Sequence, residues 1–294
     1  MNRRAIVLTL LLSAAAGGAQ AQSFIPDARS GGKLLLTGGV STIEGSGGGG
    51  IATWATVTGY GEEDGIGGNA HVTLVDLPDY QFRTAGAAIG LWDRVELSAA
   101  RQEFDTGDTG ALLGLGQGFT FAQDVIGVKV RLTGDAVYDQ DRWMPQIAVG
   151  AQHKRNDQGA IITAVGGQDD QGTEFFVAAT KLFLARSVLV SGAVRYTNAN
   201  QTGLLGFGGD ANDDREAQFE GSVGWLLRRN LVVGAEYRTK PDNLSFAAEN
   251  DWFDVYAAYA LNKHLSVTAA WADLGSIATF DDQRGLYVSL QAGF

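Results

Sequence analysis

The 294-residue chain has no cysteine, three histidines, four prolines and no long apolar run beyond its amino-terminal region. Without cysteine no disulfide can form, so stability must come from packing or from closure of a sheet. Zinc needs several imidazole or thiolate ligands, which this composition does not supply. A membrane-spanning helix needs roughly 20 continuous apolar residues, and no later segment has them. These absences exclude a disulfide scaffold, a zinc site and a helical membrane protein.

Residues 1–21 have the order of a signal peptide. Arg3 and Arg4 precede an apolar run, Ala5–Ala16, and then Ala19-Gln20-Ala21, the small-x-small pattern that a signal peptidase accepts. We expect cleavage after Ala21 and export across the inner membrane. Removing both arginines leaves 20 basic against 33 acidic residues. Such an acidic excess argues against nucleic acid as a partner.

The final segment, residues 285–294, alternates strictly between apolar and small or polar residues. Leu286, Val288, Leu290, Ala292 and Phe294 share one face. An apolar face at period two over about ten residues is typical of a strand that crosses a membrane. Within it, Val288, Leu290 and Phe294 are the predicted assembly signal, which the barrel assembly machinery would recognise.

The same alternation recurs along the chain and predicts an all-β fold, a transmembrane antiparallel up-and-down β-barrel. About fourteen strands are expected, and twelve is the alternative if residues 33–60 pair differently or stay outside the wall. The domain division is a signal peptide at 1–21, an N-terminal segment with the first strand and a glycine-rich loop at 22–50, and the remainder of the barrel at 51–294. The expected strands are 33–43, 51–60, 69–77, 80–91, 95–104, 125–134, 146–155, 173–184, 188–197, 218–227, 231–239, 251–261, 265–273 and 285–294.

Connections of two lengths support this order, because outer-membrane barrels alternate short periplasmic turns with longer external loops. Four connections of three residues each follow a leucine and precede a branched apolar residue: 92–94, 185–187, 228–230 and 262–264. Long polar or glycine-rich connections between them are the expected external loops: 105–124, 156–172, 198–216, 240–250 and 274–284. The first of these contains an apolar patch, Ala111–Gly118, which we expect to fold inward and narrow the pore or pack over its mouth.

Charged residues fall on the opposite face of the strands from the large apolar ones. A Lys or Arg facing lipid near the midplane would cost about 2–4 kcal/mol, so these charges should face the lumen. Pairing about the 228–230 turn puts Glu220 opposite Arg238, with Arg195 near enough to join them. The charges either brace the wall or form a selectivity ring. The predicted lumen charges are Glu96, Lys129, Arg131, Lys181, Arg195, Glu220, Glu236, Arg238 and Asp254.

No catalytic residue, metal site or cofactor is expected. His153 is the one position suited to a general base, but no serine on a neighbouring strand pairs with it. The acidic loop stretches 168–170 and 208–214 contain oxygen ligands suited to Ca²⁺ but match no defined calcium loop, so solvated loop tips are expected. Gly45–Gly50 lacks the lysine and helix of a phosphate-binding loop and is interpreted as a flexible hairpin or linker.

Five segments carry a family resemblance: Lys33–Val40, Phe104–Gly110, Asp139–Trp143, Ala179–Leu184 and Gly234–Asn243. They resemble an uncharacterised proteobacterial family of secreted, predicted outer-membrane proteins catalogued as a domain of unknown function. The resemblance runs over nearly the whole mature chain. It implies the bacterial outer membrane as the location and brings no established activity.

The leading functional hypothesis is a passive channel or uptake of a small solute. The runner-up is a non-transporting structural or adhesive barrel with a plugged lumen, and an outer-membrane enzyme comes third. Expected partners are outer-membrane lipid and lipopolysaccharide, the assembly machinery and a small solute. A continuous lumen would favour transport, whereas a lumen closed by its charged residues would favour the plugged barrel.

Overall fold

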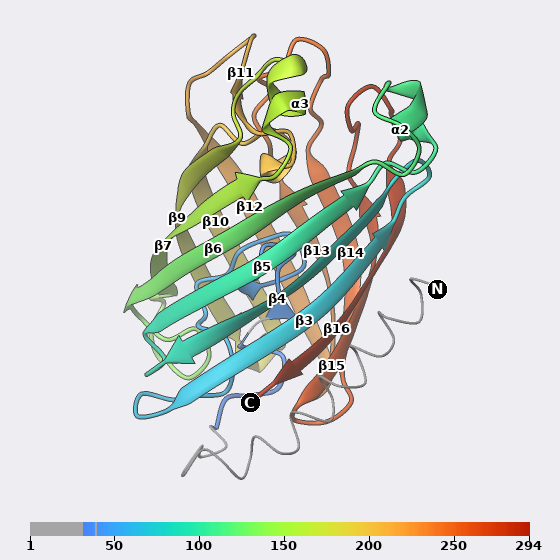
Figure 1. Ribbon diagram of the computed structural model, residues 1–294. Coiled ribbons are helices and arrows are strands. Elements are labelled where there is room, and N and C mark those ends of the chain that lie inside the picture. Colours follow the sequence, from blue (N-terminus) through green and yellow to red (C-terminus); the bar gives the residue numbers. More distant parts are fainter. Residues whose placement is uncertain (1–31, 39) are drawn as a thin grey trace.

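A computed structural model describes residues 32–38 and 40–294, so the expected signal peptide and its cleavage site lie outside the described residues. Twelve antiparallel strands close into one barrel (Figure 1). They are β3 (Ile66–Asp76), β4 (Gln81–Leu91), β5 (Val95–Asp105), β6 (Thr120–Thr133), β7 (Gln146–Asn156), β9 (Gln171–Phe183), β10 (Val188–Thr197), β12 (Glu216–Arg228), β13 (Leu231–Arg238), β14 (Trp252–Ala260), β15 (Leu265–Asp273) and β16 (Arg284–Gly293).

Alternation of side chains builds this wall, as β14 illustrates. Phe253, Val255 and Tyr259 point out and remain exposed, while Asp254 and Tyr256 point in and are buried. Neighbouring strands repeat the pattern in register, so the outer surface is apolar and the interior polar. No helix among the described residues is long and apolar enough to span a membrane.

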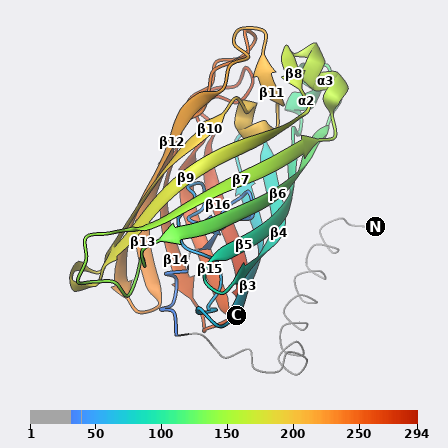
Figure 2. The same cartoon turned by 90° about the vertical axis from the view of Figure 1, so that its left-hand side faces the viewer.

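The two ends of the barrel differ in their connections (Figures 1 and 2). One end, here the turn end, has the four predicted short connections, the longer 134–145 connection and the carboxy terminus. The other, the loop end, has the five predicted long loops. These contain α2 (Thr109–Leu112), α3 (Gly159–Ala164), η2 (Asn200–Gly203) and the small pair β8 (Gly167–Asp169) and β11 (Phe207–Gly209), whereas η1 (Leu184–Arg186) lies in a short turn.

Barrel closure joins β16 to β3, the last wall strand to the first. Val288 lies opposite Leu74 and Leu290 opposite Val72. Phe294 extends the closure, because its backbone N–H donates to the Gly68 carbonyl at 3.0 Å and its own oxygen accepts from the Tyr60 N–H at 2.9 Å. No sheet edge is therefore left open to lipid.

The strand count is twelve, the alternative that the sequence left open, and the expected wall strands at 33–43 and 51–60 are wrong. This segment instead forms a hairpin with the two-residue strands β1 (Val40–Ser41) and β2 (Gly47–Gly48), which pair with each other and with no wall strand. The physical reason lies in the side chains of 51–60. Threonine and apolar residues occur on both faces of its alternation, so neither face is apolar enough for lipid. The other expected strands are present, and the largest boundary difference is the start of β6 at Thr120.

Candidate functional site: the lumen plug and the chamber above it

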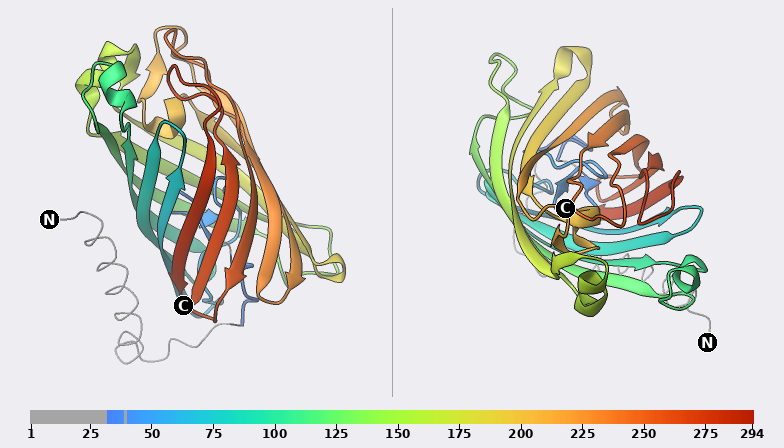
Figure 3. Two further views of the ribbon diagram at one scale, coloured as in Figure 1. Left: turned by 90° about the vertical axis from the view of Figure 1, so that its right-hand side faces the viewer. Right: turned by 90° about the horizontal axis from the view of Figure 1, so that it is seen from above.

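Residues 36–38 and 40–58 lie inside the barrel, and we call them the plug. Every one of its described residues is buried. Viewed along the barrel, the segment lies within the ring of strands (Figure 3). It enters and leaves at the same end, because a Cβ placed on Gly38 would lie 2.9 Å from the carbonyl oxygen of Gly59. The glycine-rich stretch 45–50 is thus a hairpin, one of its two predicted forms, within the lumen.

Glu44 at the tip of the plug faces three cations of the wall. Its carboxylate lies 2.5 Å from Lys154 Nζ, 2.9 Å from Arg238 Nη2 and 3.5 Å from Arg195 Nη2. Arg238 also reaches the second carboxylate oxygen at 3.1 Å, so this contact is bidentate. All four side chains are almost fully buried. A buried charge is stable only when it is paired and hydrogen-bonded, and here each one is.

Glu236 binds the plug backbone rather than a cation. One of its oxygens accepts from the N–H groups of Gly50 at 2.7 Å, Ile51 at 2.8 Å and Ala52 at 3.4 Å. This close approach requires glycine at position 49, because a Cβ there would lie 1.6 Å from the same carboxylate. A wall carboxylate therefore fixes the turn of the plug.

Glu96 and Lys129 form a third anchor. They contact each other at 3.0 Å. The Glu96 carboxylate accepts from the N–H groups of Gly47 at 2.9 Å and Thr58 at 2.8 Å, while Lys129 Nζ donates to the carbonyls of Gly47 and Trp54. This anchor holds both arms of the plug to adjacent strands β5 and β6.

The structure places eight of the nine predicted lumen charges inside the barrel. The prediction is wrong for Lys181, which lies opposite the exposed Val190 and so faces outward, while its neighbours Thr180 and Leu182 face inward. The predicted ladder is present, since Glu220 lies 2.7 Å from Arg195 Nε and 3.7 Å from Arg238 Nε and is opposite Arg238 in register. Arg131 contacts Asp93 at the turn end, and Lys181 donates to the Asp139 carbonyl. Asp254 is buried beside the plug, where a Cβ on Gly50 would lie 3.6 Å from its carboxylate. These contacts fit the bracing hypothesis, and a role in selectivity stays a prediction.

Sequence reasoning missed three members of this network. Glu44 lies between the predicted first strand and the glycine-rich loop, where no alternation assigns a face. Lys154 and Glu174 face inward and contact each other at 2.6 Å. Lys154 shares the inward face of β7 with Gln152, two residues before it, so the signal that would identify it is the alternation of that strand.

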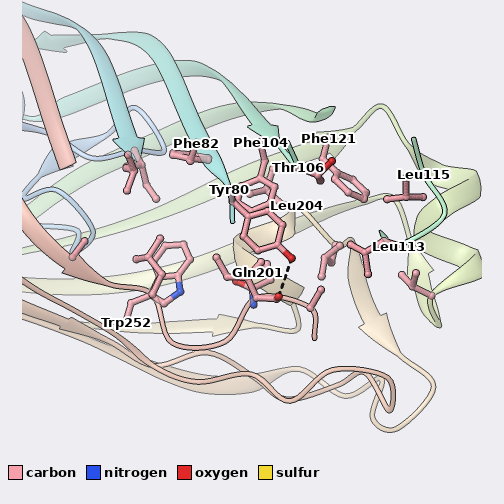
Figure 4. Close-up of a pocket in the computed structure, with 18 of the residues that line it drawn as sticks. Tyr80, Phe82, Phe104, Thr106, Leu113, Leu115, Phe121, Gln201, Leu204 and Trp252 are labelled. Atoms are coloured by element: carbon pink, nitrogen blue, oxygen red, sulfur yellow. Dashed lines mark hydrogen bonds between the residues drawn. The ribbon is translucent and has the colours of Figure 1, made fainter. Parts of the chain in front are cut away.

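An apolar chamber of about 220 Å³ lies above the plug at the loop end (Figure 4). Ile43 and Ile51 of the plug form its floor. Strand ends and all five long loops form its sides and roof. Its lining residues are Ile43, Ile51, Val75, Tyr80, Phe82, Phe104, Thr106, Leu113, Leu115, Phe121, Ile161, Val165, Gln201, Leu204, Leu205, Phe246, Trp252, Ala272, Leu274, Ile277, Ala278 and Tyr287.

Of the two arrangements predicted for loop 105–124, the structure shows packing over the mouth of the barrel. Leu113 and Leu115 line the chamber, so the loop packs over the barrel mouth. The neighbouring Leu112 points away from the protein and is 78% exposed. The closure of the lumen itself comes from the plug, not from this loop.

A second cavity, of about 480 Å³, lies on the opposite side of the plug at the turn end. Thr37, Gly38 and Thr56 of the plug line it. The remaining lining is largely polar and acidic: Lys33, Glu62, Glu63, Asp64, Asp93, Asp135, Val137, Tyr138 and Gln146. The plug therefore separates an apolar chamber at one end from an acidic cavity at the other.

The histidines form no catalytic arrangement with one another. His153 is exposed and its Nδ1 lies 3.0 Å from Thr173 Oγ1, while His264 lies in a short turn against the Gly293 carbonyl at 2.9 Å. His71 is buried inside the barrel. Within residues 32–38 and 40–294, no three His, Cys, Asp or Glu side chains are grouped as metal ligands. The positions of the three histidines do not decide whether the barrel is an enzyme.

A closed barrel with an apolar outside and a polar inside is the architecture of outer-membrane proteins, and its relatives in fold agree. The KdgM porin in complex with disordered oligogalacturonate aligns over 77% of this chain and 99% of its own, with a TM-score of 0.52 and 8% identity. A second KdgM porin structure gives 0.50 at the same coverage and identity, and the NanC porin gives 0.48 with 8% identity over 77% of this chain and 98% of its own. Identities this low show the fold alone.

The protein is thus an outer-membrane β-barrel of the bacterial cell, with its turn end periplasmic and its loop end external. No curated protein matches the sequence. The chain belongs to the family DUF3034, described as a protein of unknown function, which it matches over residues 37–291. The resemblance identified from the sequence is therefore confirmed.

Proposed function

We propose that this barrel takes up a small solute and that the plug is the gate. The observation that carries the proposal is the position of the plug as the partition between two cavities, each lined in part by plug residues. A solute that enters the external chamber meets Ile43 and Ile51, and withdrawal of the plug would connect it with the periplasmic cavity.

The way the plug is held supports movement. Its main anchors are hydrogen bonds and ion pairs to inward-facing polar side chains, such as those of Glu96 and Glu236. Polar groups released from such contacts can be solvated by water entering the lumen, whereas an interdigitated apolar contact would expose apolar surface. Because both plug ends meet at the periplasmic end, the segment can leave as a single loop without threading through the barrel.

The structural neighbour points to transport without defining the solute. The KdgM porin binds oligogalacturonate, an anionic sugar chain, in its complex. The external chamber of this chain has no charged lining residue. The solute proposed here is therefore a different one, and the proposal includes no catalytic step. We also propose lipopolysaccharide around the external loops and the assembly machinery at β16 as partners.

One observation favours the non-transporting plugged barrel as the second candidate. The Glu44 network contains several fully buried ion pairs, and such a network would also suit a permanently filled lumen. The two candidates differ only in whether the plug moves during function.

A reversible lock on the plug separates them. The chain has no cysteine, and a Cβ on Gly45 would lie 3.0 Å from the Ala100 Cβ of the wall. A disulfide needs about 3.5–4.5 Å between Cβ atoms, so Gly45→Cys with Ala100→Cys requires a small relaxation to cross-link the plug to β5. Gly45 has a φ of +91°, which strains any other residue. Comparing the oxidised and reduced forms of the same double variant removes this strain from the comparison.

We expect cells with the reduced double variant to take up at least one member of a solute panel, from arabinose to naphthalene, faster than cells with the oxidised form. For each single-cysteine variant, solute uptake should be the same under oxidising and reducing conditions. Equal uptake of every panel member by both forms, with the cross-link verified by mass spectrometry, would favour the non-transporting barrel.

A further inference from the structure

We infer that the external chamber is a binding site for a small uncharged apolar molecule with an aromatic skeleton. The inference names the solute class of the uptake proposed above and rests on that proposal for its role in transport. As a binding site, however, the chamber can be tested with the plug in either state.

Aromatic rings from separate parts of the chain meet at this chamber. Tyr80 precedes β4, Phe104 lies at the end of β5, and Trp252 begins β14 (Figure 4). The rings of Tyr80 and Phe104 are 4.8 Å apart and tilted by 38°. Ring faces and edges at such spacing attract a further flat aromatic group, because offset and edge-to-face arrangements are both favourable.

Three of the five polar side chains of the lining, Thr106, Tyr80 and Gln201, are already bonded to the protein. Thr106 Oγ1 donates to the Phe119 carbonyl at 2.8 Å, and the Tyr80 hydroxyl donates to the Ile277 carbonyl at 3.2 Å. The Gln201 amide donates to the Ser276 carbonyl and accepts from Lys240. The Trp252 Nε1–H and the Tyr287 hydroxyl have no hydrogen-bond partner among the described residues, so a ligand meets two unpaired polar groups in a lining that is otherwise apolar or already bonded. A charged or strongly polar solute would lose most of its hydration without replacement, whereas an apolar one would lose little.

The chamber's size fits a ligand of about two fused rings. An engineered apolar cavity of about 150 Å³ stays dry and binds benzene, and the chamber here is about 220 Å³. Interiors of proteins are close-packed, and an empty cavity lowers stability. Several external loops bring apolar residues, such as Leu113, Leu204 and Phe246, to one space without filling it. A ligand accounts for a space that packing alone would close.

Adjacent leucines in the α2 loop supply a matched pair of variants. Leu113 lines the chamber, whereas Leu112 is exposed and does not. Leu113→Gln places an amide against the ligand, and Leu112→Gln makes the same chemical change outside the chamber. Ala272→Phe is a second chamber variant, because Ala272 is buried in the lining and a phenyl group there would occupy the space.

The probe is 1-bromonaphthalene, measured by calorimetry on the full chain in detergent-free lipid nanodiscs, so that detergent tails do not compete. Empty nanodiscs correct for partition into lipid. We expect saturable binding to wild type and to Leu112→Gln, and affinity lower by about tenfold or more for Leu113→Gln, because burying an unpaired amide is costly. Anomalous scattering from bromine in a crystal should locate the probe among Tyr80, Phe104 and Trp252.

Binding that is equal in wild type, Leu113→Gln and Ala272→Phe, or bromine only on the outer lipid face, would overturn the inference. The oxidised plug-locked variant distinguishes this failure from that of the proposed function. If the locked form binds the probe but locking leaves uptake of every solute unchanged, the binding site stands and the uptake proposal fails. If no chamber variant affects binding but locking blocks uptake of a polar solute, the uptake proposal stands and the solute class is wrong.

Discussion

Glu44 provides the negative charge that Lys154, Arg195 and Arg238 face from the wall. Its removal would leave three buried cations sharing only Glu174 and Glu220. Breaking a buried ion pair by removing one partner is strongly destabilising, because the remaining charge is left uncompensated. At the scale of one residue, the seating of the plug thus depends on a single carboxylate.

Glu44→Gln should weaken the seating of the plug by about 3 kcal/mol, the lower range for a broken buried pair. We expect this variant to show frequent open-channel events in planar bilayers, where wild type is mostly closed. Glu63→Gln is the control, because the Glu63 side chain is 90% exposed. A Glu44→Gln barrel that folds and stays as closed as the control would show that the other anchors suffice.

Lys240 and Glu249 form a buried ion pair in the external loop 240–250, with their charged atoms 2.7 Å apart. Burial lowers the pKa of Lys240 and raises the pKa of Glu249, and their mutual attraction opposes both shifts. Both charged forms therefore cost the folded loop free energy. Because the pKa of Glu249 is raised on folding, the loop loses stability as pH rises through that pKa. Because the pKa of Lys240 is lowered on folding, the loop also loses stability as pH falls through that pKa. The loop should therefore be least stable between the pKa of Glu249 and the pKa of Lys240, where both groups are charged.

We expect Lys240→Met with Glu249→Leu to stabilise this loop by about 1 kcal/mol near neutral pH. Hydrogen-exchange protection of amides 240–250, corrected for intrinsic rates, should also fall in wild type as pH rises through the pKa of Glu249 and stay flat in the double variant. Asp281→Asn, in another exposed loop, should change neither the stability of loop 240–250 nor the pH dependence of its exchange protection. Lower protection in the double variant would mean that the ion pair stabilises the loop.

At the scale of elements, the wall could be predicted from the sequence and the plug could not. Each wall strand faces two solvents, so side chains such as Glu220 and Tyr237 reveal their face by alternation, and the short turn fixed the register that places Glu220 opposite Arg238. The plug touches only the lumen, where apolar, polar and glycine residues are all buried. Ile51 faces the chamber, whereas Thr53 bonds to Glu220 and Arg195 of the ion network. No periodicity in the sequence distinguishes plug residues that face the chamber from those that face the ion network.

The chamber was likewise only partly predictable. The apolar patch at 111–118 indicated that one loop packs inward, but the other contributors come from distant loops and strand ends. Residues such as Leu204 and Phe246 show no local pattern that would mark them as neighbours. Their meeting depends on the closure of the barrel, which brings the external loops into a ring.

The last strand closes the barrel, and Phe294 completes it. Besides its three backbone hydrogen bonds, two with Gly68 and one with Tyr60, its ring covers Gly68, where a Cβ would lie 2.8 Å from the ring. We expect Phe294→Ala to lower the amount of heat-modifiable folded protein in the outer membrane, with signal cleavage after Ala21 unchanged. The conservative Phe294→Tyr should retain most of it. Equal amounts of folded protein for Phe294→Ala would show that Val288 and Leu290 suffice for assembly.

For the whole molecule, the plug and the wall are separable parts of one chain. The twelve wall strands pair only with each other, and the plug hairpin pairs only with itself. Removing the plug leaves every ladder of the barrel intact. It also leaves inward-facing charges of both signs, such as Glu96 and Lys129, which water can hydrate once the lumen opens.

Deletion of residues 39–58 should therefore convert a closed barrel into an open channel. The deletion joins Gly38 to Gly59, which already lie in contact, so it needs little rearrangement. We expect the variant to insert, to show heat-modifiable mobility, and to conduct steadily in planar bilayers at two ionic strengths, whereas wild type conducts only in brief events. A deletion of 114–118 in the α2 loop is the control, because it opens the chamber and leaves the plug in place. If the folded plug deletion conducts no more than this control, the inward-facing side chains close the lumen without the plug, and the plug cannot be its gate.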